Sequence, residues 1–137
     1  MKTLREKMRS RKGFTLIEML IVVAIIAILV AISIPLVNSS LNKARIATDQ
    51  ANERAARAAA VIYYLTDENY EGGDVTLYYD AEDGILEPEA NFGSITKYGQ
   101  CTNHDNCVLK VTIDGDNGTV DLAWVKTANG EEQGDLH

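Results

Sequence analysis

The first half of the chain shows two hydrophobic patterns in succession. Residues 19–37 contain no charged side chain, and at about 1.5 Å per residue a helix of that length nearly spans the ~30 Å hydrocarbon core of a bilayer. Beyond this run, apolar and small residues recur at spacings of three and four, which predicts one face of a helix. This predicted stripe consists of Leu41, Ala44, Thr48, Ala51, Ala55, Ala58, Ile62 and Leu65.

Together the two patterns predict one helix from about Phe14 to about Leu65, because no glycine occurs within it. Its first part is apolar on all sides and its second part is amphipathic. Pro35 is expected to kink the helix, since proline has no N–H to donate and crowds the carbonyl four residues earlier. The other faces of the second part carry Lys43, Arg45, Asp49, Glu53, Arg54 and Arg57.

The remainder of the chain predicts β-strands. Residues 75–79 are rich in β-prone side chains, and residues 108–113 and 119–125 flank a turn at 114–118, which indicates a hairpin. One face of this hairpin would carry Cys107, Leu109, Val111 and Ile113, opposed by Val120, Leu122 and Trp124.

A sheet face of this kind must be buried against another element, and the small side chains of Ala51, Ala55 and Ala58 allow a close approach. We therefore predict an α+β fold in which a long N-terminal helix packs on a small antiparallel sheet. Residues 127–137 are expected to form a frayed tail.

Charge divides the chain into a basic leader and an acidic remainder. The leader at 1–13 has a net charge of +5, and because the whole chain carries −7, the remainder carries −12. The basic leader before an apolar run predicts that the N-terminus lies in the cytoplasm and that the chain beyond is exported. We expect a basic leader at 1–13, an apolar helix at 14–40, and an amphipathic helix with a β-sheet head at 41–137. The acidic body disfavours direct nucleic-acid binding.

Two cysteines, Cys101 and Cys107, enclose a loop of five residues. In an exported chain this spacing favours a disulfide. The alternative is metal ligation, but His104 is the only nearby histidine, and a structural zinc site takes four ligands. We expect the disulfide, no metal site and no cofactor.

The apolar run also contains a carboxylate, Glu18, within the string Gly13-Phe14-Thr15-Leu16-Ile17-Glu18. A charged side chain in hydrocarbon costs at least ~2.5 kcal/mol, so it requires a partner or a function. Snorkelling to the nearby membrane surface is the plainer alternative. A basic leader, this string and an apolar helix resemble the class III signal of type IV pilins and of the related pseudopilins.

The resemblance implies that a prepilin peptidase cuts after Gly13 and methylates the new N-terminus at Phe14. It also implies that Glu18 acts in assembly. Cleavage would expose an amine four residues from the carboxylate, so Glu18 of one subunit could neutralise Phe14 of a neighbour and fix the register. Pro35 also matches the family, whose helices loosen before this proline, although the usual preceding glycine is missing here.

Other candidate chemistry is weaker. Asp114, Asp116 and Asn117 could hold calcium, but their spacing departs from the twelve-residue calcium loop, and a type I′-like turn is the simpler interpretation. No nucleophile–base pair or phosphate-binding loop stands out, so we predict no enzymatic activity.

The predicted function is that of a structural type IV pilus subunit, anchored in the membrane before processing and then polymerised into a surface fibre for adhesion, motility, aggregation or DNA uptake. Its expected partners are copies of itself, the prepilin peptidase, the pilus assembly machinery and the membrane. Two alternatives stay open: a pseudopilin or minor pilin of a type II secretion or competence machine, and a membrane-anchored binding domain that does not polymerise.

Overall fold

The computed structural model describes Gly13 and residues 15–130 of the chain. Residues 1–12 of the predicted leader, Phe14 and residues 131–137 of the predicted tail lie outside the described residues. The chain divides into two compact units, residues 1–40 and residues 41–137, and each is described by itself.

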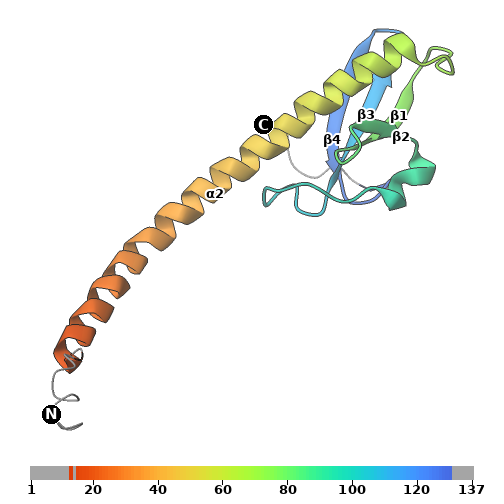
Figure 1. The fold of residues 1–137 in the computed structure, drawn as a ribbon. Helices are drawn as coiled ribbons and strands as arrows, with labels where there is room; N and C mark the ends of the chain where they lie inside the picture. Colours follow the sequence, from red (N-terminus) through yellow and green to blue (C-terminus); the bar gives the residue numbers. More distant parts are fainter. Residues whose placement is uncertain (1–12, 14, 131–137) are drawn as a thin grey trace, which may run out of the picture. The chain divides into compact units, whose positions relative to one another are not determined.

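A single helix, α2, runs from Leu16 to Thr66 (Figure 1), which confirms the predicted helix to within two residues at its start and one at its end. Within the first unit, residues 16–40 are all exposed. This part of α2 is long and apolar enough to cross a membrane. The helix continues through Pro35, and nearby Ser33 Oγ donates to the carbonyl of Leu29 at 2.7 Å.

The second unit contains a four-stranded antiparallel sheet in the order β2-β1-β3-β4. Strand β1 is Val75–Asp80, β2 is Ile85–Glu87, β3 is Val108–Asp114 and β4 is Thr119–Val125, with a 3-10 helix, η1, at Glu89–Ser94. The predicted strand at 75–79 and the predicted hairpin are therefore confirmed. Neither β2 nor η1 was predicted, and both are short.

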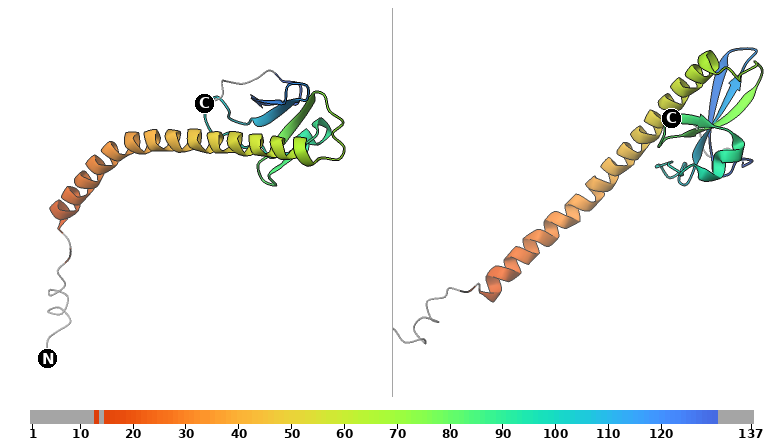
Figure 2. Two further views of the ribbon diagram at one scale, coloured as in Figure 1. Left: turned by 90° about the horizontal axis from the view of Figure 1, so that it is seen from above. Right: turned by 45° about the vertical axis from the view of Figure 1, so that its right-hand side comes forward.

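One face of this sheet packs against the second half of α2 (Figure 2). The hairpin register pairs Leu109 with Trp124 and Val111 with Leu122, so the predicted face is formed. Its core also includes Ala56 and Ala60 of the helix. The opposite face holds a second, smaller core of Tyr78, Ile95, Val108 and Val125.

The helix face against the sheet is not the predicted one. Ala51, Ala55 and Ala58 are exposed, whereas the buried helix residues are Asp49, Glu53, Ala56 and Ala60. The two faces differ by two positions, about 200° around a helix at ~100° per residue. The physical reason is that both buried carboxylates have hydrogen-bond donors in the head, so the polar pair can lie inside.

The turn of the hairpin also differs from a type I′ turn, which requires positive φ at both central residues. In the loop between β3 and β4 only Gly118 has a positive φ, of 66°, and its N–H donates to the carbonyl of Asp114 at 2.8 Å. The Asp114 carboxylate accepts the backbone N–H groups of Asp116 and Asn117 at 3.0 and 2.9 Å. The predicted calcium alternative would have to displace these bonds.

Candidate functional site

The N-terminal end of α2 places Glu18 in a specific local structure. Thr15 N–H donates to Glu18 Oε2 at 3.0 Å, and Glu18 N–H donates to Thr15 Oγ1 at 3.2 Å. This reciprocal pair is a capping box, which satisfies two backbone donors that a helix start leaves without partners. Glu18 therefore has a local structural role that the sequence analysis missed, although the spacing Thr-x-x-Glu is its sequence signature.

Gly13 lies before this cap and is exposed. A Cβ built there would meet no atom within 4 Å, so the backbone at the predicted cut site is sterically open. Phe14, the predicted methylation site, lies outside the described residues.

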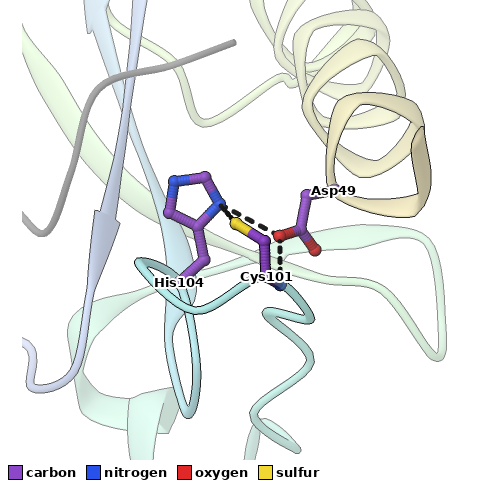
Figure 3. A group of neighbouring side chains, drawn as sticks. All are labelled: Asp49, Cys101 and His104. Atoms are coloured by element: carbon purple, nitrogen blue, oxygen red, sulfur yellow. Dashed lines mark hydrogen bonds and ion pairs between the residues drawn. The ribbon is translucent and has the colours of Figure 1, made fainter. Parts of the chain in front are cut away.

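The second candidate site lies in the head, where the loop between η1 and β3 meets α2. Asp49 Oδ1 accepts the N–H of Gln100 at 2.8 Å, and Oδ2 accepts the N–H of Cys101 at 2.9 Å. The same Oδ2 lies 3.0 Å from His104 Nδ1. Cys101 Sγ also lies 3.0 Å from that nitrogen. Figure 3 shows the three side chains converging, Asp49 from the helix and the other two from the loop.

Burial and hydrogen bonding act in opposite directions on Asp49. Burial alone disfavours its charged form, but the backbone N–H and side chain of Cys101, then the N–H of Gln100 and the ring of His104, stabilise it. The net effect is that the pKa of Asp49 is lowered below its ordinary value. Burial and the hydrogen bond with Asp49 raise the pKa of the Cys101 thiol.

The predicted disulfide partners close the ends of this loop. Both sulfurs are thiols in the structure, and Cys107 Sγ contacts the carbonyl of Asp105 at 3.6 Å. Gly99 lets the preceding segment pass against the loop, because a Cβ there would overlap the carbonyl of His104. The disulfide stays a prediction.

Trp124 and Glu53 support the site from the core. The ring of His104 stacks on the Trp124 indole, with centroids 4.6 Å apart and planes at 13°. Trp124 Nε1 donates to Glu53 Oε1 at 2.9 Å. The sequence contained a usable signal for this pair, since a buried indole N–H needs an acceptor and Asp49 and Glu53 fall on the same helix face as Ala56 and Ala60 at spacings of four, three and four.

The fold and the N-terminal sequence motif define a class of protein. Its members have an apolar N-terminal helix and a head in which a helix packs on a sheet. The model of the prokaryotic N-terminal methylation motif matches residues 8–34, which include Gly13, Phe14 and Glu18.

Two curated relatives are similar beyond this motif. The type IV major fimbrial protein FimA of Dichelobacter nodosus is 43% identical over 79 residues, covering 58% of this chain and 46% of the relative. Fimbrial protein Q of Moraxella bovis is 37% identical over 108 residues, covering 79% and 62%. The matched regions thus span about half to three fifths of these relatives. No solved structure is significantly similar to this chain.

The methylation motif and the two fimbrial relatives support a type IV pilin. The long helix packed on a four-stranded antiparallel sheet is consistent with the α+β fold of that class. Both relatives are named as fimbrial proteins.

Proposed function

We propose that this chain is the structural subunit of a type IV pilus, held in the membrane as a precursor and then polymerised through its N-terminal helix into a surface fibre. The observation that carries the proposal is the methylation motif at residues 8–34, which overlaps the start of a helix whose residues 16–40 are all exposed. A helix that is apolar on every side is stable in lipid or among other helices. The same surface would serve first in the membrane and then in the fibre.

Proteolytic processing would convert the membrane-bound precursor into the subunit that enters the fibre. A prepilin peptidase would cut after Gly13, at a backbone position that is sterically open, and would methylate the new amine of Phe14. Cutting removes the leader with its net charge of +5, which otherwise holds the N-terminus on the cytoplasmic side. The subunit could then leave the membrane for the fibre.

Glu18 would then have two roles. Its carboxylate closes the capping box with Thr15, and in the fibre it would neutralise the Phe14 amine of a neighbouring subunit. A wrong register would leave a buried charge without a partner, which is strongly unfavourable. The charge would therefore select the register, while the cap stabilises the start of the helix.

Two substitutions separate these roles. Glu18→Gln keeps a side chain that can close a capping box but removes the charge, whereas Glu18→Ala removes both. We expect both variants to insert into the membrane and neither to give normal fibres, as judged by electron microscopy of sheared surface material. Normal fibres from Glu18→Gln would contradict the charge role and leave only the cap.

Mass spectrometry of the subunit from the same fibres tests the processing step. We expect an N-terminus at methylated Phe14. An intact Met1, or a start well beyond Phe14, would contradict cleavage after Gly13.

The head would form the outer surface of the fibre. The chain after the leader carries a net charge of −12, given −7 for the whole chain and +5 for the leader, so adjacent fibres would repel one another at low salt. Adhesion, motility, aggregation or DNA uptake is the function we propose for such a fibre, with copies of the chain, the prepilin peptidase and the pilus assembly machinery as partners. Contact with DNA would then pass through another component.

Two further features belong to this proposal. Pro35 would kink α2 and act as its weak point during assembly, because it removes a backbone hydrogen bond. Outside the cell, Cys101 and Cys107 would form a disulfide that closes the loop between them.

A further inference from the structure

The loop at residues 101–107 meets the helix at a cluster of three different ligand types. Asp49, Cys101 and His104 offer a carboxylate oxygen, a sulfur and an imidazole nitrogen, and these atoms all lie within 4.8 Å of one another (Figure 3). All three residues are buried. In the sequence alone the loop offered one histidine and two cysteines, and it is the fold that brings the carboxylate to them.

The geometry excludes a catalytic relay within this cluster. In a nucleophile–base–acid triad the two partners contact opposite nitrogens of the imidazole. Here Asp49 Oδ2 and Cys101 Sγ both lie 3.0 Å from Nδ1, so they compete for one ring nitrogen. Three potential ligand atoms gathered around one point are instead typical of a metal-coordination site.

The ligand atoms all lie within 4.8 Å of one another, close to the separations around a tetrahedral cation. With bonds of about 2.0 to 2.3 Å to nitrogen, oxygen and sulfur, neighbouring ligand atoms of a tetrahedral zinc ion lie roughly 3.4 to 3.6 Å apart. The observed 3.0 Å separations would need to open by about half an ångström.

Surrounding contacts orient two of the three ligands in advance. The backbone N–H groups of Gln100 and Cys101 hold the Asp49 carboxylate, and stacking on Trp124 fixes the plane of the His104 ring. Hydrogen-bonded carboxylates and fixed imidazoles are what outer contacts supply at metal sites. A surface pocket of about 250 Å³ lies beside Cys101 and is lined also by Asn42, Ile46, Thr102 and Asn103. A water that completes the coordination would have to enter from this side.

We propose that Asp49, Cys101 and His104 form a binding site for a thiophilic divalent cation such as Zn²⁺, which fills while Cys101 is a thiol. Binding releases the thiol proton to solvent, because the thiolate is the ligand. The bound ion would tie the loop to α2, whereas the Cys101–Cys107 disulfide ties the loop only to itself.

The two states exclude each other because they use the same sulfur. Disulfide formation removes a proton from each thiol and transfers two electrons to an oxidising disulfide, which is reduced to two thiols. A dithiol/disulfide oxidoreductase is the class of reagent that would set the balance. The site is thus available before oxidation or after reduction.

Cobalt titration of the full-length chain in detergent, without an affinity tag, tests the proposal. Cys107→Ser is the background of choice, because it cannot form the disulfide and keeps all three ligands. We expect one Co²⁺ per chain, a thiolate-to-cobalt charge-transfer band in the near ultraviolet, and displacement by Zn²⁺. The wild-type chain should give the same band only after treatment with a phosphine reductant.

Three further variants in the Cys107→Ser background assign the ligands. Cys101→Ser should lose the charge-transfer band, and His104→Gln should weaken binding at least about tenfold. His137→Gln is the matched control, because His137 is the other histidine of the chain, and it should bind as the background does.

A folded Cys107→Ser chain that gives no charge-transfer band with saturating Co²⁺ would overturn the proposal. Unchanged affinity in His104→Gln would do the same. If His104→Gln fails to fold, thermal unfolding of Cys107→Ser with and without Zn²⁺ tests the site instead. The unfolding midpoint of Cys107→Ser should rise with Zn²⁺, and it should not rise when Cys101→Ser is added.

Discussion

One buried hydrogen bond couples the helix to the sheet. Trp124 Nε1 donates to Glu53 Oε1 at 2.9 Å, and Trp124 is fully buried while Glu53 is 7% exposed. A carboxylate in this position is tolerated because the indole N–H compensates for part of its lost hydration. The pair also explains why a charged residue lies on the helix face toward the core.

Removing the donor should therefore cost more than the loss of one neutral hydrogen bond. We expect Trp124→Phe to lower the free energy of unfolding by about 2 to 4 kcal/mol, since it leaves Glu53 buried without this donor and also reduces core volume. Urea unfolding followed by circular dichroism measures the change. Glu53→Gln keeps an acceptor for the indole and should cost less; an equal or larger loss in that variant would contradict this account.

Asp114 makes the hairpin loop sensitive to acid. The side chain and backbone of Asn117, followed by the backbone of Asp116, stabilise the charged carboxylate and lower the pKa of Asp114. Because the folded pKa is lower than the unfolded one, this stabilisation is present above the unfolded pKa and is lost as pH falls through the folded pKa.

NMR titration of the Asp114 carboxyl should accordingly give a midpoint below the ordinary value of about 3.9. Asn117→Ala removes the side-chain donor and should move the midpoint upward. A wild-type midpoint at or above the ordinary value would show that these hydrogen bonds do not hold the charge.

At the scale of the elements, Gly118 provides a backbone conformation that the turn of the β3–β4 hairpin requires. Gly118 adopts a φ of 66°, and a Cβ there would meet no atom within 4 Å. A side chain at this position would therefore be disfavoured by backbone conformation alone.

We expect Gly118→Ala to destabilise the head by about 1 kcal/mol, because alanine is strained in the left-handed region. Gly118→Asn is the matched control, since asparagine tolerates this region better and should cost less. Denaturant unfolding of both variants gives the comparison. Equal losses would indicate a steric cause in place of a conformational one.

The elements that could be predicted from the sequence are those with a clear period. The helix and the β3–β4 hairpin follow from spacings of three and four and from alternation around a glycine-rich turn. Strand β2 and η1, of three and six residues, are too short to produce such a period. The buried helix face was missed because Asp49 and Glu53 looked like solvent-facing residues, and only the folded head supplies the N–H groups that satisfy them.

Prediction of the sites from sequence was limited because some of their residues come together only in the folded head. Gly13, Phe14 and Glu18 form a local string that can be recognised from sequence alone, and their roles in processing and assembly stay predictions. Cys101 and His104 lie close together in sequence, but their partner Asp49 lies more than fifty positions away. No sequence spacing relates these residues before the loop and the helix are packed together.

At the scale of the whole molecule, the predicted helix stripe between Leu41 and Leu65 has a role other than packing against the sheet. Its members face away from the sheet, and Leu41, Ile62 and Leu65 are 48%, 61% and 72% exposed. Exposed apolar side chains in a row on one helix face are typical of a surface that is covered in an assembly. In the proposed fibre, neighbouring subunits would cover it.

Ile62→Lys tests this role. Because Ile62 makes little contact in the single chain, we expect the unfolding free energy of the head to change by no more than about 0.5 kcal/mol, while fibre yield falls sharply. Sheared fibres are quantified by electron microscopy and the head by thermal unfolding. Glu68→Gln changes the net charge by the same amount at an exposed position and should assemble normally; fibres from Ile62→Lys at the wild-type yield would argue against burial of this face.

The Asp49 side chain holds the loop through the main-chain N–H groups of the loop. Its two oxygens accept the N–H groups of Gln100 and Cys101, which every residue type except proline supplies. The exposed loop side chains are those of Thr102, Asn103, Asp105 and Asn106, and this anchor uses none of them. Thr102, Asn103 and Asp105 can therefore vary in evolution without breaking this anchor, whereas Asn106, at a φ of 59°, is restricted by its backbone conformation.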